Sequence, residues 1–281
     1  MLTLNEEGQI DLTKIGFYLH SDMMTNVNLR FTNDNCYKGL FNLTDSIKNG
    51  KAEGLKEYGP WKTIYEGLSQ LSPELRKSWL DFDHYYSDDA FDDALKIIFN
   101  NNPNLIFDIG GNTGKWAIAS CNNSSDVEVK IVDLPGQVEL AKKNIENTTT
   151  FKDRISYHPI DILKPETEIP GGADVYWMSQ FLDCFGTDEI LSILQRVYAA
   201  IDEHAFVYIL EPFWNNQRFP ASRFCLVGTS MYFTCIANGN SKMYHTDEME
   251  QMTVDTGFEL VDSFELIGDS YHTLLKLRKK M

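Results

Sequence analysis

The chain has 281 residues and a formal net charge of -16, and 43% of its residues are hydrophobic. This composition supports one large folded domain, or one domain with a helical extension, and excludes intrinsic disorder. The excess of carboxylates would repel phosphate backbones and anionic headgroups, so neither nucleic acid nor a membrane surface is an expected partner. The sequence has no signal peptide, no apolar run of ~18 residues and no CxxC spacing among its five cysteines. We therefore expect a cytoplasmic protein with reduced thiols.

The first hundred residues are predicted to be mainly helical. Apolar side chains recur at helical spacing, for example at Trp61, Ile64, Tyr65 and Leu68, and aromatic residues are dense over 79–91. We expect residues 20–100 to form helices that pack across the mouth of a sheet domain. Residues 2–10 could form a hairpin arm.

From about residue 104 the predicted strands and helices alternate. We expect strands over 105–110, 127–133, 155–159, 174–179 and 206–210, with helices over 114–121, 135–147 and 188–200 between them. Such alternation indicates a parallel, doubly wound α/β sheet. Two further helices, over 220–237 and 246–256, precede a strand pair over 258–265 and 271–277. This pair predicts an antiparallel hairpin at the end of the chain.

The first of these strands leads into a glycine-rich turn. Residues 105–115 read Leu-Ile-Phe-Asp-Ile-Gly-Gly-Asn-Thr-Gly-Lys, with Asp108 near the end of the strand. Gly110, Gly111 and Gly114 allow the backbone to turn tightly and to approach a ligand, and the helix that follows offers free N–H donors. The pattern predicts a nucleotide-type cofactor at the edge of the sheet.

Two cofactors fit this pattern, NAD and S-adenosylmethionine (SAM), because Asp133 at the end of the second strand can bind ribose hydroxyls in both cases. Three features favour SAM. The glycines lack the GxGxxG spacing for a pyrophosphate. Asp108 suits the ammonium of a methionine group, and Asp161 with Ile162 is placed to bind an adenine amino group and ring. Each aspartate alone could cap a loop or a helix, but all three follow successive strands.

At these residues the chain resembles a known family. Asp108-Ile-Gly-Gly-Asn-Thr-Gly, Val132-Asp133-Leu134-Pro135-Gly136 and Asp161-Ile-Leu are similar to the SAM-binding motifs of class I methyltransferases. More narrowly, they resemble those of the hydroxyindole/caffeate-type small-molecule O-methyltransferases, and residues 58–61 and 82–88 look like the bacterial branch. The resemblance implies a Rossmann-like sheet of seven strands with a C-terminal antiparallel hairpin. It further implies that the cofactor is SAM, with S-adenosylhomocysteine as product, and that its ligands include Asn112, Leu134, Ser179 and Gln180.

The resemblance also suggests how the chain is organised. Family members carry an N-terminal winged-helix dimerisation domain, and this sequence is expected to begin inside its wing hairpin. We therefore expect residues 1–100 to form a remnant wing hairpin and a helical lid and dimerisation segment, with residues 101–281 as the SAM-binding catalytic domain. The expected partners are a small aromatic acceptor and a second copy of the chain.

The catalytic base is less easily assigned. Deprotonating a phenol at neutral pH calls for a nearby base, which in plant-type relatives is a histidine after the fourth strand. Asp183 occupies that place here and could act only if burial raised its pKa or if the substrate were already acidic. It could equally be a carboxylate at a helix N-terminus. His245 and His84 are the alternative candidates. No cluster of His, Cys and Asp has metal-ligand spacing, so a bound metal is not expected.

Several residues are candidates for the acceptor side. Glu211 follows the fifth strand, Tyr85 lies beside His84, and Tyr232 and Met243 belong to a stretch rich in aromatic residues and methionine. Aromatic residues at helical spacing can equally be core residues. O-methylation of an aromatic hydroxyl is the leading hypothesis. C-methylation of a phenolic ring, a SAM-binding protein without activity and an NAD-dependent reductase remain as alternatives.

Overall fold

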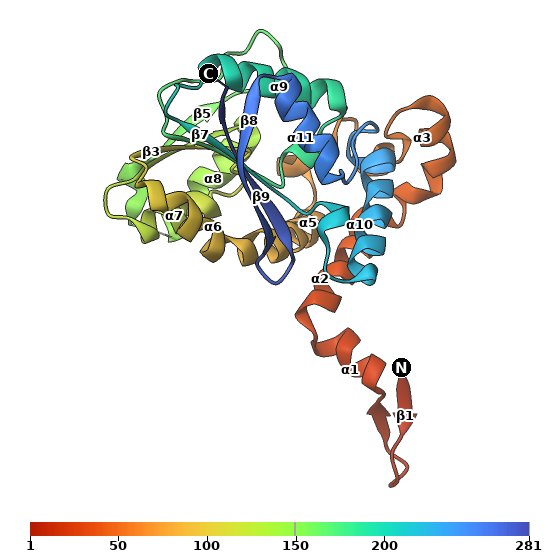
Figure 1. Cartoon of the computed structure of the whole chain (residues 1–281). Coiled ribbons are helices and arrows are strands. Elements are labelled where there is room, and N and C mark those ends of the chain that lie inside the picture. The colour runs from red at the N-terminus through yellow and green to blue at the C-terminus, as the bar shows by residue number, and fades with distance from the viewer. Residues whose placement is uncertain (149, 281) are drawn as a thin grey trace.

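The computed structural model describes residues 1–148 and 150–280, which form one main body and a projecting N-terminal arm (Figure 1). Seven strands make a single sheet in the order β5-β4-β3-β6-β7-β9-β8. The first five strands in this order are parallel, and β9 and β8 close the sheet as antiparallel strands. The strands of this sheet are β3 (Leu105–Ile109), β4 (Glu128–Asp133), β5 (Ile155–Pro159), β6 (Val175–Ser179), β7 (Phe206–Glu211), β8 (Phe258–Ile267) and β9 (His272–Lys279).

Helices cover both faces of this sheet because its central strands are apolar on both sides. One face, with Phe107, Met178 and Ile209, packs against α9 (Thr187–Ala200) and α11 (Thr246–Asp255). The other face, with Ile106 and Trp177, packs against α6 (Phe91–Ile98), α7 (Lys115–Asn123) and α8 (Pro135–Thr148). The parallel sheet with its C-terminal antiparallel pair confirms the predicted fold class.

A third apolar cluster joins the N-terminal helices to a helical segment from the second half of the chain. Phe31, Ile64 and Leu68 pack here against Tyr232 and Ile236. The elements before the sheet are α1 (Lys14–Ser21), α2 (Met23–Phe31), the π-helix η1 (Thr32–Cys36), η2 (Gly39–Asn42), α3 (Leu43–Asn49), η3 (Glu53–Glu57), α4 (Ile64–Gly67), η4 (Leu68–Gln70), α5 (Pro73–Ser87), η5 (Asp88–Ala90) and, after α6, η6 (Phe99–Asn101).

The remaining short elements lie between the strands. They are η7 (Phe151–Arg154), η8 (Leu182–Cys184), η9 (Trp214–Asn216), α10 (Pro220–Tyr232) and the π-helix η10 (Phe233–Ala237). The single helix expected over 220–237 is thus an α-helix that continues as a π-helical turn. Figure 1 shows α10 beside α2, away from the sheet.

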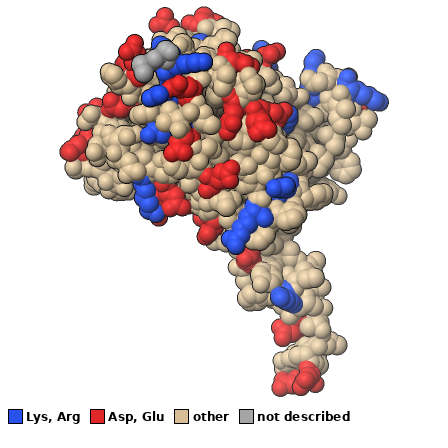
Figure 2. Space-filling model, viewed as in Figure 1, with Lys and Arg blue, Asp and Glu red and all other residues tan. Residues whose placement is uncertain are grey.

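The arm consists of a small hairpin followed by α1. Strand β1 (Leu2–Leu4) pairs antiparallel with β2 (Ile10–Leu12), which confirms a hairpin at the start of the chain. Its apolar side chains are exposed, with Leu2 at 65% and Ile10 at 73%. Figure 2 shows carboxylates spread over the main body and few charges along the arm. Within the described residues, no helix is long and apolar enough to cross a bilayer.

Candidate active site

A cavity of about 430 Å³ lies at the carboxyl ends of the parallel strands, beneath α4, α5 and α10. Parallel strands end at the same edge of a sheet, so the loops after β3, β4, β5 and β6 converge there. One half of the cavity is formed by these loops, and we call it the glycine-loop half. The other half is walled by aromatic side chains from the N-terminal helices and α10, and we call it the aromatic half. The aromatic walls include Phe31, Tyr65, Trp79, Phe82, Tyr232 and Phe233.

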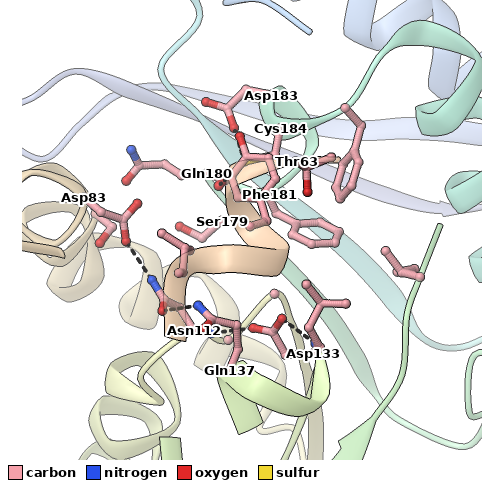
Figure 3. A pocket seen from close by; sticks show the side chains of 18 of the residues that line it. Thr63, Asp83, Asn112, Asp133, Gln137, Ser179, Gln180, Phe181, Asp183 and Cys184 are labelled. Carbon is pink, nitrogen blue, oxygen red and sulfur yellow. Dashed lines mark hydrogen bonds between the residues drawn. The ribbon is translucent and has the colours of Figure 1, made fainter. Parts of the chain in front are cut away.

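The loop after β3 has the backbone conformation that its glycines allow. Gly110 has φ of 77°, and a Cβ at this position would lie 2.2 Å from the Phe181 ring. Asn112 also has positive φ, 49°. Its backbone N–H donates to the Asp133 carboxylate at 2.8 Å, and its side-chain oxygen accepts a hydrogen bond from Gln137 at 3.2 Å (Figure 3). The loop is thereby fixed against the end of β4.

A buried carboxyl group, Asp108, and a partly buried one, Asp133, lie beneath this loop. Asp108 is 2% exposed, and its Oδ2 has no hydrogen-bond partner among the described residues. Burial, with a contribution from the Asp133 charge, raises the pKa of Asp108 to about 8. Burial also raises the pKa of Asp133 to about 6, although its two backbone hydrogen bonds oppose this. A cationic or hydrogen-bond-donating ligand would stabilise the ionised form of each carboxyl group. Both groups therefore favour binding of such a ligand.

The loop after β5 supplies the far wall of the glycine-loop half. Asp161 and the buried Ile162 both line the cavity there. Arg196 from α9 holds this loop by donating to the carbonyl oxygens of Ile162, of Lys164 at 3.3 Å and of Thr167 at 3.2 Å. An acidic side chain and an apolar one are thus presented side by side from a braced loop.

The end of β6 contributes polar groups next to the glycine loop. Ser179 and Gln180 line the cavity, and Gln180 adopts a positive φ of 45°. The Ser179 Oγ and Gln180 Oε1 atoms are buried without a partner among the described residues. Strained backbone together with unsatisfied buried polar atoms is typical of a ligand site.

Helix α5 and the first residue of η5 are fastened to the glycine loop and the start of α7 by three side-chain pairs, which we call the α5 latch. Its pairs are Asn112 Nδ2 with Asp83 Oδ2 at 3.0 Å, Thr113 Oγ1 with His84 Nε2 at 2.9 Å, and Lys115 Nζ with Asp88 Oδ2 at 2.6 Å. Because α5 also carries Trp79 and Phe82, the latch fixes the aromatic half relative to the glycine loop.

Two carboxyl groups lie where the halves of the cavity meet. Asp183 in η8 is 5% exposed, and its Oδ1 accepts a weak hydrogen bond from the Cys184 thiol at 3.4 Å. Burial raises the pKa of Asp183 to about 7, and the charge of Asp83 adds to this shift. Figure 3 shows Asp83 and Asp183 on different walls of the same cavity.

Glu211 lies behind Asp183. Its Oε1 accepts hydrogen bonds from the backbone N–H groups of Phe181 at 3.0 Å and Leu182 at 2.8 Å, so it fixes the loop that carries Asp183. Burial and the nearby Asp183 charge raise the pKa of Glu211 well above its usual range. The ionised form of Asp183 therefore disfavours ionisation of Glu211.

Residues 40–259 match the family model of the O-methyltransferase domain. The chain belongs to this family. The match includes the glycine loop, Asp133, Asp161 and Asp183, together with most of the helical segment before the sheet.

Two curated proteins illustrate what the chain is similar to. L-tyrosine C(3)-methyltransferase from Streptomyces lavendulae is 22% identical over 224 residues, which are 79% of this chain and 60% of that protein. Demethylspheroidene O-methyltransferase from Rhodobacter capsulatus is 21% identical over 72% of this chain and 48% of its own length. The chain thus spans about half to two thirds of the length of these relatives.

Solved structures share the fold. Mitomycin 7-O-methyltransferase superposes with a TM-score of 0.79 at 19% identity, covering 98% of this chain and 78% of the other. An O-methyltransferase from neocarzinostatin biosynthesis, solved with SAM and 2-hydroxy-5-methyl naphthoic acid, gives a TM-score of 0.74 at 18% identity and covers 99% and 81%.

The cavity brings together most of the predicted site residues. It is lined by Asp108, Gly110, Gly111, Asn112, Asp133, Leu134, Asp161, Ile162, Ser179, Gln180, Asp183, His84, Tyr232 and Met243. Sequence reasoning missed Gln137, Lys115, Tyr65, Trp79 and Cys184, which also line it. Gln137 lies in the first turn of α8, just after the Asp-Leu-Pro motif. This position could have identified it as a site residue.

Four predicted residues lie outside the lining of this cavity. His245 caps α11 by accepting from the Asp247 N–H at 3.1 Å, and its ring packs on Trp214. A Cβ on Gly114 would lie 2.7 Å from Ile145, so this glycine allows close packing of α8 instead. Tyr85 packs against Tyr86. Glu211 points to backbone N–H groups, as described above. The side chains of His245, Tyr85 and Glu211, all outside this lining, thus have protein partners of their own.

Replacing Asp108 by asparagine is expected to stabilise the unliganded protein at pH 8. A carboxyl group whose pKa is higher in the folded than in the unfolded state holds its proton longer when folded. Its contribution to stability therefore falls as the pH rises from about 4 to about 8. Thermal unfolding followed by circular dichroism measures this effect. The melting temperature of the variant, relative to that of the wild type, should rise by several degrees between pH 5 and pH 8. Equal pH dependence of the two proteins would contradict a buried Asp108 with a raised pKa.

Proposed function

We propose that the protein is a SAM-dependent methyltransferase that methylates the hydroxyl group of a small aromatic acceptor. One observation carries this proposal. A single cavity combines three carboxylates at successive strand ends around a glycine loop with a half that is walled by aromatic side chains.

The residues of the glycine-loop half fit the three parts of SAM. Asp108, with its unpartnered Oδ2, would bind the ammonium of the methionine group, close to the backbone of Gly110 and Gly111. Asp133 would accept the ribose hydroxyls, and Asp161 with Ile162 would bind the adenine. When bound, SAM supplies an electrophilic methyl group and departs as the neutral thioether S-adenosylhomocysteine.

The residues of the aromatic half would prepare the acceptor. Its aromatic walls exclude water and hold a ring by stacking, so the reacting oxygen is presented in one orientation. Asp183, at the boundary of the two halves, is the group we assign as the base that takes the hydroxyl proton. A carboxylate whose pKa is about 7 is well matched to this task at neutral pH.

C-methylation of a phenolic ring is the second candidate. It is favoured by the similarity to a tyrosine C(3)-methyltransferase and by the carboxylate at position 183, where a histidine is expected for phenol O-methylation. The two products have the same mass, so the stability of the methylated product toward ether cleavage is the measurement that separates them. A product resistant to ether cleavage would overturn O-methylation.

We further propose that residues 1–100 form the helical lid and dimerisation segment and residues 101–281 the catalytic domain of a homodimer. The exposed apolar side chains of the arm, such as Leu2, Ile10 and Ile15, support a second copy as its partner. All five cysteines are free thiols, which supports the cytoplasm as the compartment of action. A molar mass of one chain in light scattering would exclude the dimer.

Calorimetry with S-adenosylhomocysteine tests the cofactor assignment. We expect the wild type to bind it, and Asp133→Ala to weaken binding by an order of magnitude or more, because the ribose loses its acceptor. Asp153→Ala, a carboxylate outside the cavity lining, is the matched control and should bind like the wild type. NAD binding without binding of S-adenosylhomocysteine would overturn the proposal.

A further inference from the structure

Tyr65 is a residue of the aromatic half to which no motif points. It lies in α4, whose first turn is capped by Thr63 and whose apolar residues Ile64 and Leu68 are buried in the third cluster. These contacts hold the short helix over the cavity. The Tyr65 ring lines that cavity while its hydroxyl reaches toward η8.

The Tyr65 hydroxyl is buried and makes no hydrogen bond of standard geometry with any residue that the structure describes. Its neighbours are the thiol of Cys184, which is a weak partner, and the more distant Asp183 and Tyr232. A buried hydroxyl without a good partner costs free energy, and such groups usually find one in a ligand or in ordered water.

The other hydroxyl groups of the aromatic half already have partners. Tyr232 Oη accepts a hydrogen bond from the Trp79 indole at 2.8 Å. Thr229 Oγ1 donates to the Cys225 carbonyl at 3.0 Å, and Thr63 accepts from the Glu66 N–H at 3.4 Å. Tyr65 is therefore the unsatisfied hydroxyl among these groups, and it lies on the side where Asp183 enters the cavity.

We propose that Tyr65 donates a hydrogen bond to the acceptor's hydroxyl oxygen and holds it against the Asp183 carboxylate. This inference rests on the proposed function and names the group that orients its acceptor. The two side chains are complementary: the carboxylate accepts the acceptor's proton, and the tyrosine hydroxyl satisfies a lone pair of the same oxygen.

The surroundings keep Tyr65 in the donor form. Burial raises its pKa well above the usual value, and the thiol of Cys184 and the charge of Asp183 act in the same direction. A phenol that stays protonated cannot compete with Asp183 for the acceptor's proton. Tyr65 is thus a binding and positioning group, and Asp183 alone changes its protonation state.

A cycle of binding measurements tests this role without methyl transfer. The affinities of 2-naphthol and naphthalene are measured by calorimetry for the wild type and Tyr65→Phe, both saturated with S-adenosylhomocysteine. We expect the wild type to prefer 2-naphthol, and this preference to fall by about 3- to 10-fold in Tyr65→Phe, the range of one neutral hydrogen bond. Naphthalene should bind equally to both proteins, which a merely structural role of Tyr65 would not give.

Tyr198→Phe is the matched control, since Tyr198 packs on Phe258 away from the cavity; it should keep the wild-type preference. Should Tyr65→Phe fail to fold, Tyr65→Met removes the same hydroxyl from a side chain that adapts to the space. A wild type that binds both compounds equally, or a preference unchanged in Tyr65→Phe, would overturn the proposal. The affinity for S-adenosylhomocysteine reports separately on the proposed function, so the two can fail independently.

Discussion

Replacing Asp183 by asparagine is expected to lower the rate of methyl transfer at neutral pH by two orders of magnitude or more, the usual contribution of a general base. Asparagine keeps the size of the side chain but cannot accept the hydroxyl proton. Steady-state kinetics with a phenolic acceptor should therefore show a fall in kcat, while calorimetry shows unchanged affinity for S-adenosylhomocysteine.

The pH profile gives this expectation a second readout. As the proposed base, Asp183 would act as the carboxylate. The kcat of the wild type should therefore rise with pH and level off above about 7, the pKa of this group. The kcat of Asp183→Asn should not show this rise with pH. Asp188→Asn, an exposed carboxylate in the first turn of α9, is the control and should leave the profile in place. A variant at Asp183 with the wild-type rate and profile would show that positioning alone, or another base, is responsible.

Replacing Gly110 by alanine is expected to reduce the affinity for S-adenosylhomocysteine by at least a hundred-fold. Gly110 has φ of 77°, and an added Cβ would lie 2.2 Å from the Phe181 ring, which is packed beside Phe185. The ring or the loop must move, and both belong to the cavity. Calorimetry measures the loss, and thermal unfolding shows whether the fold survives.

Gly172→Ala separates the two causes of this effect. Gly172 also has positive φ, 91°, but nothing lies within 4 Å of an added Cβ. This control therefore introduces the backbone strain of about 1–2 kcal/mol without the clash. It should lower the melting temperature and leave ligand affinity unchanged. Equal affinities of the two alanine variants would refute the importance of the contact between Gly110 and Phe181.

The sheet and the glycine-loop half were predictable because short-range signals determine them. A buried strand followed by a glycine turn, and an aspartate after each of the next two strands, specify where those side chains meet once the strands are parallel. Asp108, Asp133 and Asp161 accordingly share one cavity. The helix boundaries were also close, because glycine, proline and capping residues mark them.

The aromatic half was predicted less well, because it depends on packing between segments far apart in the chain. Trp79 and Tyr232 are 153 residues apart and meet through a hydrogen bond that no local pattern reveals. The direction in which side chains point was also not predictable from the sequence. Glu211 is the last residue of β7, at the edge where site residues are expected, yet its carboxyl group turns toward backbone N–H groups of the neighbouring loop. His245 is a helix cap, a role that its place before α11 also permits.

The α5 latch has a consequence for how such proteins diversify. The residues that wall the aromatic half lie on helices outside the sheet, whereas the groups we assign to SAM lie at the strand ends. Three side-chain pairs join the two parts. Mutations on α4, α5 or α10 can thus change the residues that line the aromatic half without disturbing the residues assigned to SAM binding. As long as Asp83, His84 and Asp88 are retained, a homologue can keep the proposed methyl transfer and change its acceptor.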